Sequence, residues 1–450
     1  NITTTSLVIG DTTSGNITVD GITAANSNNI SGTVTLNATA AGASLSFSNT
    51  ASTFNAVTAN ADNRISVNAD LTADAGHLRL EGDADNAADG NDDIRFAAGV
   101  TVTAANTLFL DATTGGMTGL GALTLNAGNG ISLPDNLTTA GATVIDADTN
   151  DNGSGTFSIS AAKALSTTGN TLSITADDIT ITGTINSGAA ATTILVSDGG
   201  TIGLGATAGN MTISGAELQN ITATGLIVGD TTAGSITVNG ITAANSNNVS
   251  GTTSLVAGGN GAIVTFATAA STFNALSASG DDRVVVDVAI TTDTGNLALD
   301  GDADNAADTN DNIAVAAGLT LTSAGSITLD ATTGNITGAG ALTLNAAGGV
   351  TLNDSLTTAG ATVIDADTDD NGAGTFTLAA SKALSTTANT LSITADDIAL
   401  SGTVNTAGST TTLLVSDGGT IGLGATAGNL TISGAELQNI MATGLTIGDA

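Results

Sequence analysis

A three-residue phrase, an apolar residue followed by Thr or Ser and then another apolar residue, recurs along the whole chain. The clearest case is the stretch 171–183, TLSITADDITITG, in which the phrases Leu172–Ile174 and Ile179–Ile181 flank Ala-Asp-Asp. An alternation with a period of two is typical of a strand with one buried face. Because Gly, Asn, Asp and Ala separate the phrases, the sequence predicts an all-β chain of many very short strands.

The core of such a chain has to be built almost without aromatic side chains. Among 450 residues there are no Trp, no Tyr, no Cys, 1 Pro and 8 Phe. Aromatic residues normally supply much of a globular core, so we expect rows of stacked Ile, Leu and Val instead. The lack of Cys excludes disulfides, thiol catalysis and Cys-ligated metals.

The charge of the chain limits its partners. Lys and Arg total 6 and Asp and Glu total 41, which gives a net charge of −35. Such a surface repels nucleic acid and anionic membranes, and it attracts cations. No run of about 18 apolar residues is present, so the sequence predicts no membrane insertion in this segment.

The chain is a tandem repeat. Asn1-Ile2-Thr3 recurs at positions 220–222, and the stretch 139–148 returns unchanged, with the same shift, at 358–367. We therefore expect a first copy over 1-219, a second copy over 220-438 and the start of a third over 439-450. No linker interrupts the boundary at 216–225, which favours one continuous elongated body over several globular domains.

Two architectures fit this pattern. One is an antiparallel array of sandwich domains, and the other is a parallel β-helix, or β-solenoid, in which equivalent strands of successive coils stack in register. The strands are very short, and Asn-Gly and Asp-Gly hairpin turns are sparse relative to their number, so the parallel β-helix is favoured. With ~20 residues per coil, one copy would hold about 11 coils.

Two turns in each copy are rich in acidic side chains, and clustered oxygen ligands are what Ca²⁺ requires. The candidate metal ligands are Asp83, Asp85, Asp146, Asp148, Asn150 and Asn152 in the first copy, and Asp302, Asp304, Asp365, Asp367, Asp369 and Asn371 in the second. The first turn also contains Asp89, Asp92 and Asp93, with Asp308 and Asp311 in the second copy.

The second acidic turn carries part of a recognised motif. Residues 148–153 and 367–372 match the first half of a calcium loop, D-x-[DN]-x-[DN]-G, but Ile159 and Leu378 stand where its bidentate Glu belongs. The sequence thus leaves two interpretations open, bound calcium and a solvated loop of turn-forming residues.

Other ionisable side chains give no sign of catalysis. His77 is alone and the second copy has Asn at its position, so we expect it on the surface. Lys163 and Lys382 occupy matching positions, and each is expected to pair with a nearby Asp. Asp177-Asp178 has no supporting base or nucleophile and is interpreted as part of a turn. The sequence predicts no enzyme, no catalytic residue and no cofactor other than calcium.

Three phrases resemble a known family. They are residues 121–127 (GALTLNA), 345–352 (NAAGGVTL) and 430–434 (LTISG), the last of which repeats 211–215 (MTISG). They are similar to the repeats of filamentous haemagglutinin-type adhesins and other giant bacterial surface β-strand-repeat proteins. The likeness extends over essentially the whole chain. The resemblance implies a right-handed parallel β-helix, export across the outer membrane and a role as a fibrous adhesin or surface filament.

The function expected from these observations is structural: the shaft of an extracellular fibre or giant adhesin at the bacterial cell surface. Its expected partners are other copies of itself, joined end to end or laterally, and other cells or surface polymers. One alternative is a calcium-binding adhesive module that recognises a cell-surface or glycan ligand through the acidic loops. A second is an ice-binding β-helix, because each strand phrase turns a hydroxyl outward and stacked coils would align these hydroxyls in a ladder.

Overall fold

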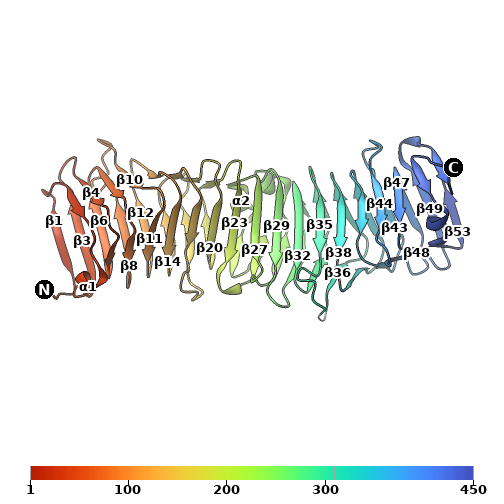
Figure 1. Ribbon diagram of the computed structural model, residues 1–450, viewed down its shortest axis with the longest axis horizontal. Coiled ribbons are helices and arrows are strands. Elements are labelled where there is room, and N and C mark those ends of the chain that lie inside the picture. The colour runs from red at the N-terminus through yellow and green to blue at the C-terminus, as the bar shows by residue number, and fades with distance from the viewer. Residues whose placement is uncertain (1, 308–309, 449–450) are drawn as a thin grey trace. The chain divides into compact units, whose positions relative to one another are not determined.

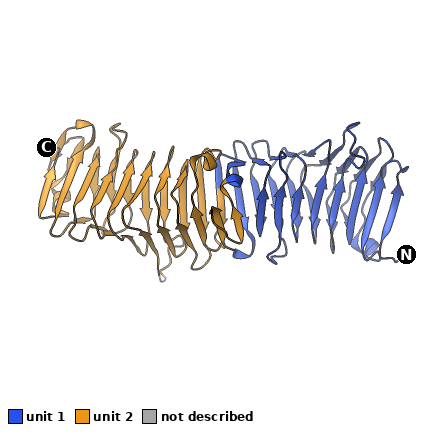
Figure 2. Ribbon diagram, turned by 180° about the vertical axis from the view of Figure 1, so that it is seen from behind, with its two compact units in different colours: residues 1–200, 216–226 blue, residues 201–215, 227–450 orange. Residues whose placement is uncertain are grey.

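The computed structural model describes residues 2–307 and 310–448. Strands make up 49% of the chain and helices 5%, and they lie in long parallel sheets (Figure 1). Contacts divide the chain into unit 1, residues 1–200 with 216–226, and unit 2, residues 201–215 with 227–450 (Figure 2). The all-β prediction is confirmed, and the parallel pairing excludes the antiparallel sandwich alternative.

In unit 1 the chain passes through three parallel sheets in turn, and each strand pairs with an equivalent strand of the next coil. The first sheet contains, in spatial order, β1 (Leu7–Asp11), β3 (Thr33–Ala38), β6 (Ala56–Ala61), β9 (Leu78–Glu81), β12 (Leu108–Asp111), β15 (Ile131–Leu133), β18 (Thr156–Ile159) and β21 (Asp178–Ile181). The second contains β2 (Ile17–Val19), β4 (Ser44–Phe47), β7 (Arg64–Val67), β10 (Asp93–Phe96), β13 (Met117–Gly119), β16 (Leu137–Thr139), β19 (Ala164–Ser166), β22 (Thr184–Asn186) and β26 (Ile221–Thr222). The third contains β5 (Ser52–Phe54), β8 (Leu71–Ala73), β11 (Val100–Ala104), β14 (Leu123–Ala127), β17 (Thr143–Asp146), β20 (Leu172–Ala176) and β23 (Ala191–Val196).

Unit 2 is built in the same way. One sheet contains β25 (Met211–Ile213), β24 (Ile202–Gly205), β28 (Ile236–Asn239), β30 (Ile263–Phe266), β33 (Arg283–Val286), β36 (Asn312–Val315), β39 (Asn335–Gly338), β42 (Leu356–Thr358), β45 (Ala383–Ser385), β48 (Thr403–Asn405) and β52 (Ile440–Met441). Another contains β31 (Ser271–Phe273), β34 (Ile290–Thr292), β37 (Leu319–Ser323), β40 (Leu342–Ala346), β43 (Thr362–Asp365), β46 (Leu391–Ala395), β49 (Thr410–Val415) and β53 (Gly444–Ile447). The remaining strands are β29 (Thr252–Ala257), β32 (Ala275–Gly280), β35 (Leu297–Asp300), β38 (Ile327–Asp330), β41 (Val350–Leu352), β44 (Thr375–Leu378) and β47 (Asp397–Leu400), together with the pair β50 (Ile421–Leu423) and β51 (Leu430–Ile432). An arrangement of this kind is consistent with a β-helix or solenoid.

The helices are single turns. They are α1 (Ala24–Ser27), α2 (Gly215–Gln219), α3 (Ala243–Ser246) and α4 (Gly434–Gln438), with 3₁₀ turns at Ser197–Gly199 and Ser416–Gly418. Strand β27 (Gly225–Asp230) and helix α2 contain residues of both units. No helix in the described ranges is long and apolar enough to span a membrane.

The stretch 171–183 folds as its alternation predicts. In β20 the side chains of Leu172 and Ile174 are buried while those of Ser173 and Thr175 turn outward. In β21 Ile179 and Ile181 are buried in the same manner. A period of two therefore decides which face of each strand enters the core.

The buried faces of successive strands form continuous rows. One row of unit 1 consists of Leu45, Ile65, Ile94, Met117, Leu137, Leu165, Ile185 and Ile221, each paired in register with the next. None of them is more than 2% exposed. A buried aliphatic side chain stabilises a fold by roughly 1.5–3 kcal/mol. Because each is covered by the coils before and after it, no coil is expected to be stable alone.

The coils are longer and less uniform than the ~20 residues expected. The coil that starts at Val57 reaches the partner of this residue at Leu78, which is close to the expected length. The next coil runs from Leu78 to its partner Leu108 and is clearly longer. The longer coil contains the acidic turn 82–92, so this turn is an insertion that leaves the strand register unchanged.

Replacing the fully buried Ile145 of β17 by Ala should lower the free energy of unfolding by about 2–5 kcal/mol, because its row loses a side chain and keeps a cavity. The matched control is Val144→Ala on the same strand, where the side chain is 44% exposed and the change should be within about 0.5 kcal/mol. Urea unfolding followed by circular dichroism measures both variants. Equal losses would contradict the alternation of buried and exposed positions.

Candidate functional site

The predicted metal ligands lie in two turns of each unit, where the chain leaves one sheet for the next, except Asp146 and Asp365, which end the strands β17 and β43 before two of these turns. In unit 1, residues 82–92 connect β9 to β10 and residues 147–155 connect β17 to β18. In unit 2, residues 301–311 connect β35 to β36 and residues 366–374 connect β43 to β44. Asp308, in the third of these turns, lies outside the described residues.

The turn 82–92 separates the two Asp residues that the sequence places together. Asp83 is fully buried, and its Oδ2 accepts a hydrogen bond from the backbone N–H of Thr114 (2.7 Å). Asp85 is exposed, and its Oδ1 accepts from the backbone N–H of Ala87 (2.9 Å). Asp83 therefore faces the neighbouring coil, whereas Asp85 stabilises the turn locally.

The corresponding turn of unit 2 repeats this division. Asp302 is fully buried and accepts from the backbone N–H of Thr333 (2.7 Å). Asp304 is exposed and accepts from the backbone N–H of Ala306 (2.8 Å).

The half-motif turn of unit 1 does not gather its side chains around one point. Asp146 Oδ1 accepts from the backbone N–H of Asp148 (3.1 Å), and the buried Asp148 accepts through Oδ2 from Ser197 Oγ (2.7 Å). Asn152 donates instead to Asn129 of the preceding coil (2.9 Å). Asn150 is exposed.

The half-motif turn of unit 2 repeats the two bonds of its Asp residues but not the bond of its Asn. Asp365 Oδ1 accepts from the backbone N–H of Asp367 (3.2 Å), and Asp367 Oδ2 accepts from Ser416 Oγ (2.6 Å). Asn371 donates to Asp369 Oδ2 (2.9 Å).

Further carboxylates lie beside the half-motif turns. Burial raises the pKa of Asp198, and the negative charges of Asp151 and Asp148 raise it further. Burial likewise raises the pKa of Asp177, followed by the charges of Asp148, Asp178 and Asp198. Sequence reasoning missed Asp198. Its position could have indicated it: Asp198 follows strand β23 as Asp148 follows strand β17, and these strands lie two coils apart in one sheet.

The acidic turns nevertheless form no compact ligand sphere. Among the described residues, no group of three or more His, Asp or Glu side chains is placed so that it could hold a metal ion. The turns combine local backbone bonds with crowded negative charge.

The basic residues neutralise carboxylates elsewhere. Lys163 forms an ion pair with Asp135, and Lys382 forms one with Asp354. Asp135 and Asp354 are almost fully buried, so these pairs satisfy charges that would otherwise destabilise the fold. The predicted pairing of both lysines is confirmed.

His77 occupies the surface, as predicted. Its Nδ1 lies 2.6 Å from Thr107 Oγ1, and its Nε2 lies 3.3 Å from Asn106 Nδ2. Both partners are neutral side chains of the next coil, so the contacts brace adjacent coils.

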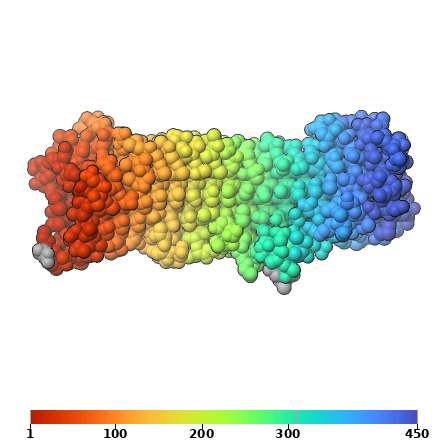
Figure 3. All heavy atoms as spheres, in the orientation of Figure 1, coloured from red at the N-terminus to blue at the C-terminus, as the bar shows by residue number. Residues whose placement is uncertain are grey.

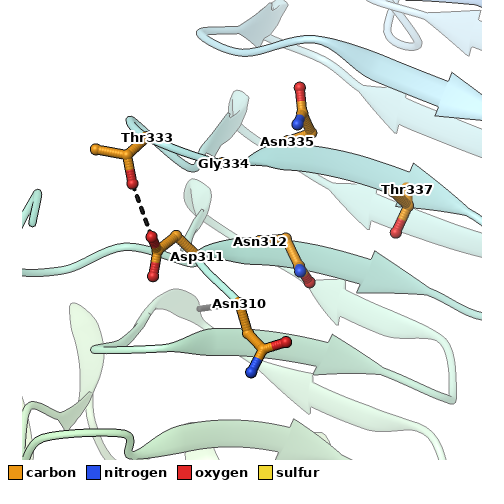
Figure 4. A pocket seen from close by; sticks show the side chains of 7 residues that line it. All are labelled: Asn310, Asp311, Asn312, Thr333, Gly334, Asn335 and Thr337. Atoms are coloured by element: carbon orange, nitrogen blue, oxygen red, sulfur yellow. Dashed lines mark hydrogen bonds between the residues drawn. The ribbon is translucent and has the colours of Figure 1, made fainter. Parts of the chain in front are cut away.

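A hollow of about 270 Å³ opens beside the acidic turn of unit 2 (Figure 4). Its lining residues are Asn310, Asp311, Asn312, Thr333, Gly334, Asn335 and Thr337. Thr333 Oγ1 donates to Asp311 Oδ2 across one side of it (2.8 Å). The lining offers amides, hydroxyls and one carboxylate, which suits hydrogen bonding or a cation better than acid–base chemistry. On the face drawn in Figure 3, the described residues of each unit form a closely packed surface.

Comparison with known proteins gave no match. A scan of protein-family models, a search of curated proteins and a search of solved structures each found nothing similar.

Glu81 has a pKa near neutrality. It accepts from Arg79 (2.6 Å), yet burial, and then the negative charge of Asp111, raise its pKa from 4.5 to about 7. Between these two values the folded protein holds a proton that the unfolded chain has released. Its contribution to stability is therefore present below pH 4.5 and is lost as the pH rises to about 7.

Glu81→Gln should remove this part of the pH dependence. We expect the melting temperature of the variant to exceed that of the wild type by an amount that grows as the pH rises through the pKa of Glu81. Melting curves at closely spaced pH values measure the difference, with Asp85→Asn as a control for an exposed carboxylate. Parallel curves for wild type and Glu81→Gln would contradict the raised pKa.

Proposed function

We propose that this chain is part of the shaft of an extracellular fibre or giant adhesin at the bacterial cell surface, without enzymatic activity. In this proposal the stacked sheets are a right-handed parallel β-helix whose repeating unit is the tandem copy 1-219. Copies follow one another along the fibre. Each copy bears mechanical load and adds to the length of the fibre.

The observation that carries the proposal is a strand pair whose two sequences recur elsewhere in the chain. Within unit 2, β24 pairs with β28, and Ile202 and Leu204 lie opposite Ile236 and Val238. The sequence of β24, Ile-Gly-Leu, returns in β50, and the sequence of β28, Ile-Thr-Val, already occurs in β2. The same two strand sequences could therefore pair at every boundary between consecutive copies in an array.

Strands β24 and β50 share a sequence, and their exposed fractions show which side chains the pairing with β28 buries. Leu204 is fully buried beneath β28, whereas Leu423 of β50 is 51% exposed. Ile421 is likewise more exposed than its counterpart Ile202. A further coil with the sequence of β2, either in the same chain or in another copy, would cover these apolar side chains.

The near-identity of the copies also favours a spacer over an enzyme. An enzyme needs only one copy of its catalytic site, and nothing in the chemistry requires the whole surrounding surface to be duplicated. A shaft instead gains length with each identical copy, because every coil supplies the template for the next.

Leu423→Asp should abolish end-to-end association, because a charge would replace the apolar side chain that the next coil covers. Val144→Asp is the matched control, since Val144 is a similarly exposed strand residue in the middle of unit 1. Sedimentation and electron microscopy should show wild type and Val144→Asp associating and Leu423→Asp remaining monomeric. Lateral assembly predicts the reverse order, and a wild type that never associates would contradict end-to-end joining.

The location and form of the fibre are tested on cells. Antibodies raised against this protein should label intact source cells and decorate thin fibres whose axial spacing is ~4.8 Å. An antibody against a cytoplasmic protein, which should label only permeabilised cells, is the control. Labelling confined to permeabilised cells would contradict the surface role.

A further inference from the structure

We propose that Asp83 and Asp92 of unit 1 bind a divalent cation, best matched by Ca²⁺, and that Asp302 and Asp311 form the equivalent site of unit 2. This inference does not depend on the shaft function. The sequence groups Asp83 with Asp85 as candidate ligands. The structure instead brings Asp83 close to Asp92, and we assign the cation to this pair.

The two carboxylates of unit 1 meet at one threonine. The backbone N–H of Thr114 donates to Asp83 Oδ2 (2.7 Å), and its Oγ1 donates to Asp92 Oδ2 (3.3 Å). Asp92 Oδ2 also accepts from the backbone N–H groups of Asp89 and Gly90, each at 3.2 Å. Asp83 and Asp92 are 0% and 3% exposed. Two buried carboxylates thus lie beside each other.

Each of these carboxylates has a second oxygen that lacks a partner. Asp83 Oδ1 and Asp92 Oδ1 are buried and accept no hydrogen bond within the described part of the chain. The ion pairs of the described residues engage other carboxylates, such as Asp93, Asp135 and Asp354. Leaving two buried carboxylate oxygens without a donor or a cation is strongly unfavourable. A cation bound by both oxygens removes this penalty.

A second oxygen lies close to Asp92 Oδ1. A Cβ atom at Gly90 would lie 3.3 Å from Asp92 Oδ1 and 2.3 Å from the amide oxygen of Asn63. A side chain at position 90 would therefore clash with Asn63, and glycine lets this amide oxygen and Asp92 Oδ1 lie close to the same point. Such oxygens are the ligands that Ca²⁺ prefers.

The arrangement occurs a second time. Asp302 Oδ2 accepts from the backbone N–H of Thr333 (2.7 Å), and Asp311 Oδ2 accepts from Thr333 Oγ1 (2.8 Å; Figure 4). Asp302 Oδ1 is again buried without a partner among the described residues. Gly334 follows the threonine, and a Cβ there would lie 1.2 Å from the carbonyl oxygen of Asp311. Only glycine permits the close approach that brings this threonine to both carboxylates.

The donor chemistry favours calcium over other metals. All available donors are hard oxygens, and Ca²⁺ accepts six to eight of them in irregular geometry, whereas Mg²⁺ demands a near-ideal octahedron. Two carboxylates per site, completed by amide or carbonyl oxygens and water, correspond to a dissociation constant of roughly 10⁻⁴–10⁻³ M. The bound ion would tie the turn 82–92 to the following coil, which contributes Thr114.

The first test is a count of bound ions. Equilibrium dialysis with radioactive calcium at about 1 mM free Ca²⁺ compares the wild type with the double variant Asp83→Asn/Asp302→Asn, which keeps an acceptor for the threonine N–H. We expect the variant to bind two fewer ions per chain than the wild type. The matched control, Asp85→Asn/Asp304→Asn, removes the same charge from exposed positions of the same turns and should bind as many ions as the wild type.

The second test is thermal unfolding by circular dichroism with Ca²⁺, Mg²⁺ or a chelator. Calcium should raise the melting temperature of the wild type and of the control more than that of Asp83→Asn/Asp302→Asn. In chelator the Asp83→Asn/Asp302→Asn variant should melt at or above the wild type, because a buried repulsion has been removed. If this variant fails to fold, Asp92→Asn/Asp311→Asn replaces it in both measurements.

A wild type that binds no calcium, or a folded variant that binds as many ions as the control, would overturn the proposal. End-to-end association is measured separately, in chelator. A failure of calcium binding therefore does not count against the shaft function.

Discussion

The burial of each inward side chain depends on an equivalent side chain of the next coil. Parallel pairing in register places Leu45 on Ile65 and Ile65 on Ile94, and the row continues through the second sheet of unit 1. Leu204, which lies beside β28, is fully buried, whereas its counterpart Leu423 is 51% exposed. Contact between neighbouring coils is thus the interaction that stabilises every strand, and it allows nearly identical copies to follow one another.

The same stacking determines where charge can be accommodated. Turns can lengthen without disturbing the sheets, so the acidic residues collect in them, and some carboxylates become buried against the next coil. The chain has only 6 Lys and Arg residues for 41 Asp and Glu residues. Lys163 and Lys382 satisfy two of the buried carboxylates. Asp83 and Asp302 keep an oxygen without a partner among the described residues, and the proposed cation would neutralise this charge.

Much of the fold was predictable because strand alternation is a local property. The phrases of 171–183 become β20 and β21, with the expected residues buried. The length of the coils was not predictable in the same way. Turns of different length are tolerated between matched strands, so the step from Leu78 to Leu108 is longer than the step from Val57 to Leu78. For the same reason, sequence spacing grouped Asp83 with Asp85, although the two side chains point to different environments.

The sequence by itself determined the strand phrases, the acidic turns, the tandem repeat and the scarcity of basic and aromatic residues. These features depend on neighbouring residues or on composition, and they can be read without knowing which coils touch. Only the tertiary structure decided that Asp83 and Asp92 share Thr114, and that Asp198 lies beside Asp148. Those contacts join residues one or two coils apart, and the number of residues between them depends on turn lengths that no local pattern specifies.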